Sequence, residues 1–384
     1  MAPAAAGLLL PRSTGSRPAG ATVRRHPTTG EDWMTDVSAH TTTDGAVARA
    51  RAVVRLNTAY FRAKVLQSAV ELGVFDLLDG GPQPAADICA KLGIRHRLAV
   101  DYLDALTGLG LLERDGDRYG NSATAAEFLV SDRPAYLGGT ARQHAKLHYH
   151  AWGKLADAMR EGRAQSAVAA QGAKAYVNYY EDLEQARRVM THMDAHNGFT
   201  ADEIARQLDW RGYTTVTDVG GARGNVAARI VQAVPHLRGH VVDLPALRPL
   251  FDELMAQLGT AGQVQFHGGD FFADPIPESD VIVVGHVLAD WPQPRRVELL
   301  RRCHAALRPG GTVVVYDVMV DDDRDDVEAL LQRLNSAMIR DDMGAYRVTE
   351  CAGYLREVGF TVEKAYRTDT ITRDHFVIGR KAAS

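Results

Sequence analysis

The loop between residues 216 and 225 is the part of the chain whose residue types and spacing best suggest chemistry. It reads Val216-Thr-Asp-Val-Gly-Gly-Ala-Arg-Gly-Asn225, after a β-branched run and before a helical pattern. A strand, a glycine turn and a helix in this order are typical of a nucleotide-binding unit. The glycines that permit a sharp turn and a close approach to a ligand are Gly220, Gly221 and Gly224. Because position 222 is alanine, the loop lacks the dinucleotide fingerprint, and Asp218 favours a cationic or amine-bearing ligand.

Acidic and aromatic residues follow the loop in a regular order. A second strand ends at Asp243 and Leu244, and an acid in that place can accept both hydroxyls of a ribose. A third strand ends before Asp270, which could accept an adenine amino group while Phe271 packs on the base. Residues 280–285 are almost purely apolar, as expected for a strand that is covered on both faces.

In this order and at these separations, the markers resemble those of the class I S-adenosylmethionine (SAM) methyltransferases. Over roughly residues 50–380 the chain resembles the plant-type small-molecule O-methyltransferases, which include caffeate, hydroxyindole and antibiotic-tailoring enzymes. The resemblance implies SAM as cofactor and an α/β fold. Its SAM-binding domain would be Rossmann-like, with a mostly parallel sheet and a reversed last strand, preceded by a helical winged-helix domain that forms a homodimer. The acceptor would be a small, aromatic secondary metabolite, methylated on a hydroxyl or an activated carbon.

The catalytic base is the point at which this sequence departs from the family. The family carries the base in a His-Asp-Trp motif, which reads Ala289-Asp290-Trp291 here. An alanine cannot accept a proton. Of the two acids that orient the family's histidine, one is retained as Asp317, and the other position falls near Tyr346.

Several mechanisms therefore stay open. His286, with Asp317, could replace the base, as could one of three histidines expected near the pocket, His148, His150 or His196. An acceptor such as a hydroxyquinone could instead be acidic enough to need no base. An ordinary phenol with a pKa near 10 is only about one part in a thousand ionised at pH 7. The acceptor could also be a carbon or an amine, or the chain could bind SAM without catalysis.

The elements that must position these residues divide the chain into four parts. We expect a disordered leader over 1–45, a winged-helix dimerisation domain over 46–135, a helical linker and pocket roof over 136–208, and the SAM-binding domain over 209–384. Apolar residues at helical spacing predict helices over 47–78 and 135–162. The dipeptide Asp115-Gly116 predicts the turn of a hairpin.

The resemblance also predicts which side chains line the substrate pocket. They are His148, Trp152, Met193, His196, Asp290, Trp291, Asn335 and Met338. His192 and His196 share a helix face and could hold a metal with Asp194. No glutamate follows in the zinc-protease pattern, and we predict no catalytic metal.

Composition and charge exclude other classes of protein. The 384 residues carry a net charge of -4, and the supposed recognition helix at 97–109 holds one basic and two acidic residues, so nucleic-acid binding is not expected. The three cysteines are far apart, which predicts a reducing environment without disulfides. No apolar run is long enough to span a bilayer. The sequence thus predicts a cytoplasmic enzyme.

Overall fold

The computed structural model describes residues 43–169, 180, 182–341, 344 and 346–383. The chain divides into two units, and the boundary lies between Tyr60 and Phe61. In the first unit the described part is helix α1 (Thr43–Asn57). The disordered leader predicted over 1–45 falls almost entirely outside the described residues.

The helical stretch predicted over residues 47–78 is broken into three helices. These are α1, α2 (Tyr60–Leu72) and α3 (Val74–Leu78). Gly73 separates the last two with a φ of 78°, a left-handed conformation that ends a helix readily at glycine. The continuous apolar spacing predicted the helical faces but not the breaks.

The predicted hairpin lies in a small helical domain with a three-stranded sheet of order β1-β3-β2. Its elements are β1 (Gln83–Pro84), α4 (Ala85–Leu92), α5 (Ala99–Gly108), β2 (Leu112–Asp115), β3 (Arg118–Asn121) and α6 (Ala123–Phe128). The predicted hairpin forms, but its two turn residues are Gly116, with a φ of 61°, and Asp117. The turn is thus one residue later than Asp115-Gly116, because Asp115 ends β2 and pairs with Arg118. The helices and strands bury a common core that includes Phe75, Leu103 and Leu106.

The helical region that precedes the large sheet contains a π-helical turn. Its elements are α7 (Gly138–Gln143), the π-helical turn η1 (His144–His148), α8 (Tyr149–Trp152), α9 (Leu155–Glu161) and the long helix α11 (Leu183–Gln207). The single helical stretch predicted over 135–162 is therefore interrupted, first by η1 and then near Gly153. A π-turn adds a residue to the helical repeat and changes the direction in which the following side chains point.

The large domain is built on a seven-stranded sheet of order β6-β5-β4-β7-β8-β10-β9. Its strands are β4 (Thr215–Val219), β5 (Arg238–Asp243), β6 (Val264–Gly268), β7 (Ser279–Gly285), β8 (Leu307–Asp317), β9 (Thr361–Arg367) and β10 (His375–Arg380). The first five are parallel, and β10 runs antiparallel to both of its neighbours. The Rossmann-like sheet with a reversed last strand is confirmed.

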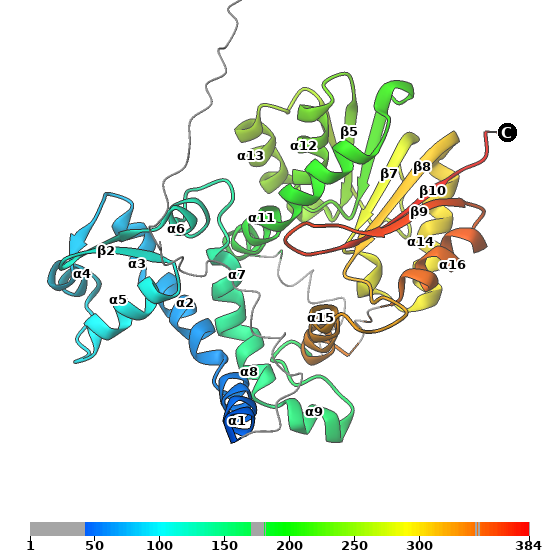
Figure 1. Cartoon of the computed structure of the whole chain (residues 1–384). Coiled ribbons are helices and arrows are strands. Elements are labelled where there is room, and N and C mark those ends of the chain that lie inside the picture. Colours follow the sequence, from blue (N-terminus) through cyan, green and yellow to red (C-terminus); the bar gives the residue numbers. More distant parts are fainter. Residues whose placement is uncertain (1–42, 170–179, 181, 342–343, 345, 384) are drawn as a thin grey trace, which may run out of the picture. The chain divides into compact units, whose positions relative to one another are not determined.

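Helices cover both faces of this sheet (Figure 1). One face is covered by α12 (Asn225–Ala233) and α13 (Arg248–Leu258), and the other by α14 (Gln293–Ala306) and α16 (Val348–Glu357). Helix α15 (Val327–Ile339) follows β8 in the chain. Strand β7 shows the result most clearly, because Val281 and Val283 enter one core while Ile282 and Val284 enter the other. All of the parallel strands thus end at one edge, where the loops form the site. No helix among the described residues is both long and apolar enough to cross a membrane.

Candidate active site

The glycine-rich loop packs tightly against the strand next to it. Gly220 has a φ of 74°, and a Cβ added there would lie 2.5 Å from Cγ2 of Val287. Only glycine fits both the backbone conformation and the space. The loop then turns through Ala222, whose N–H donates a hydrogen bond of 2.7 Å to Oδ2 of Asp243.

Asp243 ties the loop to the end of β5. Its Oδ1 accepts the N–H of Leu244 at 2.7 Å, so both carboxylate oxygens hold backbone groups of the site. The residue is 9% exposed, and burial raises the pKa of its carboxyl group to about 6. A ligand that offers hydroxyl donors would favour the ionised carboxylate.

Asp218 does not line the cavity at this edge of the sheet. It is 2% exposed and lies beneath the loop, where a Cβ on Gly221 would come within 2.5 Å of its Oδ2. Oδ2 has no hydrogen-bond partner among the described residues. Burial and the neighbouring charge of Asp243 raise the pKa of Asp218 to about 7. Of the three predicted loop glycines, Gly220 lines the cavity, while Gly221 and Gly224 lie behind it.

The cavity at the strand ends has a volume of about 320 Å³. Its lining includes four residues predicted to bind SAM, which are Asp243, Leu244, Asp270 and Phe271. It also includes Asp290 and Trp291, which were predicted for the substrate pocket and do not line the second cavity described below. Phe271 and Trp291 meet edge to face with ring centroids 6.2 Å apart. The Arg295 guanidinium lies 3.5 Å from the ring centroid of Phe272. A glycine cradle, a buried carboxylate, the exposed Asp270 and an aromatic wall fit the ribose and adenine of SAM.

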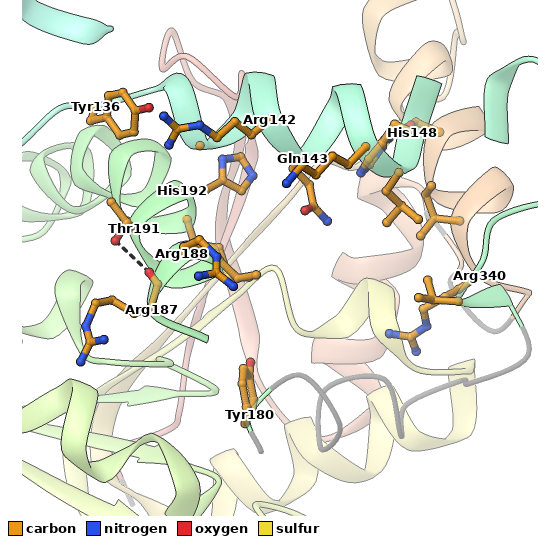
Figure 2. A pocket seen from close by; sticks show the side chains of 18 of the residues that line it. Tyr136, Arg142, Gln143, His148, Tyr180, Arg187, Arg188, Thr191, His192 and Arg340 are labelled. Carbon is orange, nitrogen blue, oxygen red and sulfur yellow. Dashed lines mark hydrogen bonds between the residues drawn. The ribbon is translucent and has the colours of Figure 1, made fainter. Parts of the chain in front are cut away.

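A second cavity, of about 730 Å³, adjoins the first (Figure 2). Tyr180 and Met193 line both cavities, so they mark the passage between them. The predicted pocket residues His148, Met193 and Asn335 line this second space. We refer to it below as the acceptor cavity and to the first as the cofactor cavity.

The side-chain amide of Asn335 fixes the tautomer of His148, one of the histidines that line the acceptor cavity. Oδ1 of Asn335 lies 2.9 Å from Nε1 of Trp152 and 2.7 Å from Nδ1 of His148. Because an indole nitrogen can only donate, the amide atom that faces it must be oxygen, and Nδ1 of His148 must donate as well. Nε2 of His148 is then the acceptor nitrogen. Burial lowers the pKa of His148 to about 4, so its ring is neutral.

A second set of imidazoles surrounds Thr140. Its hydroxyl bonds Nδ1 of His192 and lies 2.9 Å from Nε2 of His196, while its carbonyl oxygen lies 2.9 Å from Nδ1 of His144. Burial lowers the pKa of His192 to about 3 and that of His196 to about 4. His192 lines the acceptor cavity, whereas His196 does not. Among the described residues no cluster of three or more metal-binding side chains is present.

Ala289 lies beside the carboxylate of Asp317, which several groups of the protein contact. Oδ2 of Asp317 accepts the Ala289 N–H at 3.1 Å and the Tyr346 hydroxyl at 3.1 Å. Oδ1 accepts the N–H of Val318 at 2.9 Å. Tyr346, 2% exposed, thus occupies the neighbourhood in which the family carries its second acid. The carboxylate that orients a histidine in the family here contacts the ring of His286 at 3.5 Å, and residue 289 is an alanine.

The structure argues against His286 as the base. Its Nδ1 lies 3.5 Å from Asp317 and its Nε2 lies 3.2 Å from Asp374, so both ring nitrogens face carboxylates. Burial alone would lower its pKa, but the two carboxylates outweigh burial and raise the pKa well above 6.5. A cationic imidazolium with both N–H groups engaged cannot accept a proton. Asp374 gave no signal in the sequence because it lies in the last part of the chain, far from any motif.

Two other pocket predictions differ from the structure. Met338 is 1% exposed, does not line the cavity, and packs in a small core with Ala151 and Ala158. Trp152 does not line the acceptor cavity and acts on it through Asn335. The sequence analysis also missed Arg340, which lines the acceptor cavity and approaches Asp290 at 3.9 Å.

Comparison with known proteins agrees with this geometry. The family model of the O-methyltransferase domain matches residues 152–361, and that of the O-methyltransferase dimerisation domain matches residues 54–131. The chain therefore belongs to the SAM-dependent O-methyltransferase family, and it is a methyltransferase that uses SAM.

Its relatives include methyltransferases of bacteria and of vertebrates. The N,N-dimethyltransferase OxyT of Streptomyces rimosus is 51% identical over 89% of this chain and 99% of that protein. The tetracenomycin polyketide synthesis 8-O-methyl transferase TcmO of Streptomyces glaucescens is 43% identical over 86% of this chain and 96% of that protein. Human N-acetylserotonin methyltransferase in complex with SAM has a similar fold, with a TM-score of 0.76 and 26% identity over 90% of this chain and all of that one.

Proposed function

We propose that this enzyme transfers methyl groups from SAM to an amino nitrogen of a small polycyclic aromatic metabolite. The observation that carries the proposal is the state of the family's base position. Residue 289 is alanine, and its N–H shares the carboxylate of Asp317 with the Tyr346 hydroxyl and the His286 ring. The relative with 51% identity is named an N,N-dimethyltransferase, which supports nitrogen as the acceptor.

The chemistry of an amine suits a site without a base. SAM supplies an electrophilic methyl group on a sulfonium, and a neutral amine attacks with its own lone pair. The amine releases its proton after the bond has formed, so no residue has to remove one beforehand. The protein's task is to position the acceptor and to exclude water, to which the buried Phe272, Val287 and Leu288 contribute.

Methylation of an acidic hydroxyl is the second candidate. A hydroxyl that is already ionised at neutral pH also needs no base, and TcmO, at 43% identity, is named an 8-O-methyl transferase. Both candidates share the property that a residue at position 289 need not accept a proton.

A matched pair of acceptors tests the choice between nitrogen and oxygen. The enzyme would be given labelled SAM and either 3-amino-2-naphthoate or 3-hydroxy-2-naphthoate, and mass spectrometry would locate the new methyl group. We expect methyl transfer to the amine, including a second transfer to the same nitrogen. Transfer to oxygen alone would favour the second candidate and contradict the first.

We propose further that the enzyme acts as a homodimer. In addition to the match of the dimerisation domain, helix α1 exposes Val53 and Leu56 by 68% and 71%, an apolar surface that association would cover. Light scattering should give a dimer for the wild type and a smaller species for Val53→Asp with Leu56→Asp. Arg51→Asp, on the same helix, is the control and should stay dimeric. A wild-type monomer would refute this assembly.

A further inference from the structure

The acceptor cavity carries an unusual balance of charge. Five of its lining side chains are cationic, and its described lining contains no aspartate or glutamate. They are Arg142, Lys146, Arg187, Arg188 and Arg340. The whole chain, by contrast, is slightly acidic, with a net charge of -4. Positive charge is therefore concentrated at this cavity.

Two of the five cations already have acidic partners. Arg187 pairs with Glu253 at 2.7 Å and also with Glu184. Arg340 is 3% exposed and lies 3.9 Å from Asp290, a residue of the cofactor cavity. These two belong to ion pairs of the protein and do not require a ligand.

The other three cations form no ion pair with any described residue. The one contact recorded for Arg142 is with the ring of Tyr136, whose centroid lies 5.7 Å from the guanidinium carbon. Lys146 and Arg188 are exposed at the cavity. Figure 2 shows the side chain of Arg142 on α7 and that of Arg188 on α11, the helix that also carries His192.

No acidic side chain of the described lining offsets this grouping. Arg142 lies on α7 and Lys146 on the π-helical turn η1, and both line the cavity. The imidazoles beside them, His148 and His192, are neutral and offset none of the charge. An anionic group in the cavity would be attracted by all three cations at once.

We propose that the acceptor binds as an anion, its carboxylate or ionised vinylogous hydroxyl held by Arg142, Lys146 and Arg188. This deepens the proposed function and rests on it. The same charge has a consequence for the reacting atom. Cations in the cavity disfavour an ammonium ion, so they keep a bound amine neutral and nucleophilic. They would also favour the ionised form of an acidic hydroxyl.

Binding of matched anionic and neutral probes tests the proposal without any turnover. Calorimetry would use the full chain saturated with S-adenosylhomocysteine. The carboxylate pair is 3-hydroxy-2-naphthoate and its amide, and the vinylogous pair is 2-hydroxy-1,4-naphthoquinone and its methyl ether. The wild type should bind at least one anion about tenfold more tightly than its neutral partner. Whichever pair shows the preference identifies the kind of anion.

Substitutions then assign the preference to the three residues. Arg142→Gln with Arg188→Gln should remove most of the tenfold preference and leave the neutral probe's affinity unchanged. Lys146→Gln, at an exposed position, should remove part of it and guards against a folding defect in the double variant. Arg301→Gln, an exposed arginine on α14 outside the cavity, is the matched control and should change nothing.

The outcomes separate this proposal from the proposed function. Equal affinity for anion and neutral partner, no measurable binding of either anion, or a preference that survives in the double variant would each overturn it. Because the measurement involves no methyl transfer, it can fail while transfer to nitrogen succeeds. Conversely, an anion preference would stand even if the methyl group were found on oxygen.

Discussion

The cofactor cavity and the acceptor cavity are assembled in different ways. Residues 220–295 provide most of the cofactor cavity, on loops that follow consecutive parallel strands. The acceptor cavity is drawn from α7, η1, α11 and α15, and its central contact joins His148 to Asn335 across 187 positions of the chain. The shape of the cofactor cavity therefore depends on local loop geometry, whereas the shape of the acceptor cavity depends on how helices from distant parts of the chain pack together. Substitutions should affect SAM binding and acceptor chemistry separately.

The loop glycine gives the largest expected effect. Gly220→Ala should weaken SAM binding by about 100-fold or more, because a Cβ would strain a φ of 74° and press on Val287, which lines the cofactor cavity. Calorimetry measures the change. Gly262→Ala, where a Cβ meets nothing within 4 Å, is the control. An affinity within about threefold of wild type would show that the loop is not the cradle that we describe.

The carboxylate at the end of β5 should matter somewhat less. Asp243→Ala removes the acceptor of the Ala222 and Leu244 N–H groups and a partner for the ribose, each of which is a charged hydrogen bond worth about 1.5–3 kcal/mol. SAM affinity should fall at least about tenfold, while the affinity of the acceptor probes stays the same. Asp252→Ala, exposed on α13, is the control. Unchanged SAM affinity would refute the ribose assignment.

The buried Asp218 predicts a pH dependence of folding. Its pKa is raised from 3.8 to about 7 in the folded protein, so the native state binds an extra proton between these values. Stability from this group is present at low pH and is lost as pH rises from about 4 to about 7, by up to about 4 kcal/mol. Thermal unfolding without SAM should show this loss between roughly pH 4 and 7 in the wild type. Asp218→Asn should show a smaller loss, because Asp243 and Asp194, whose pKa values burial also raises to about 6, still contribute. Asp252→Asn should show the full loss. A wild-type curve parallel to that of Asp218→Asn would contradict the buried-acid assignment.

The smallest effect on turnover is expected for the substitution that restores the family's histidine at position 289. Ala289→His should leave turnover within about twofold of wild type or lower it, because Tyr346 already occupies Asp317 and a ring would crowd a partly buried position. Turnover would be followed across roughly pH 6 to 9 with the better acceptor of the matched pair. A large gain confined to pH values above the imidazole pKa of about 6.5 would mean that the natural acceptor is an ordinary phenol.

The sequence by itself determined much of the lining of the cofactor cavity. Glycines, acids and apolar strands recur at fixed separations because each parallel strand must end at the same edge and each loop must turn there. Gly220, Asp243, Leu244, Asp270 and Phe271 could therefore be placed before any coordinates, and all of them line the cofactor cavity. Local patterns also gave the hairpin near Gly116, whereas the reversed strand at the end of the sheet was expected from the family resemblance.

Only the tertiary structure decided the state of the catalytic centre. Periodicity placed Met338 on a helix face but could not tell a cavity wall from a core, because the residues packed against it, Ala151 and Ala158, come from helices distant in the sequence. His286 looked like a free imidazole until Asp374, 88 positions away, proved to contact it. The protonation of His148 and the charge of the acceptor cavity likewise depend on groups from separate helices. Such properties arise from electrostatic contacts between residues remote in the chain, and no local pattern encodes them.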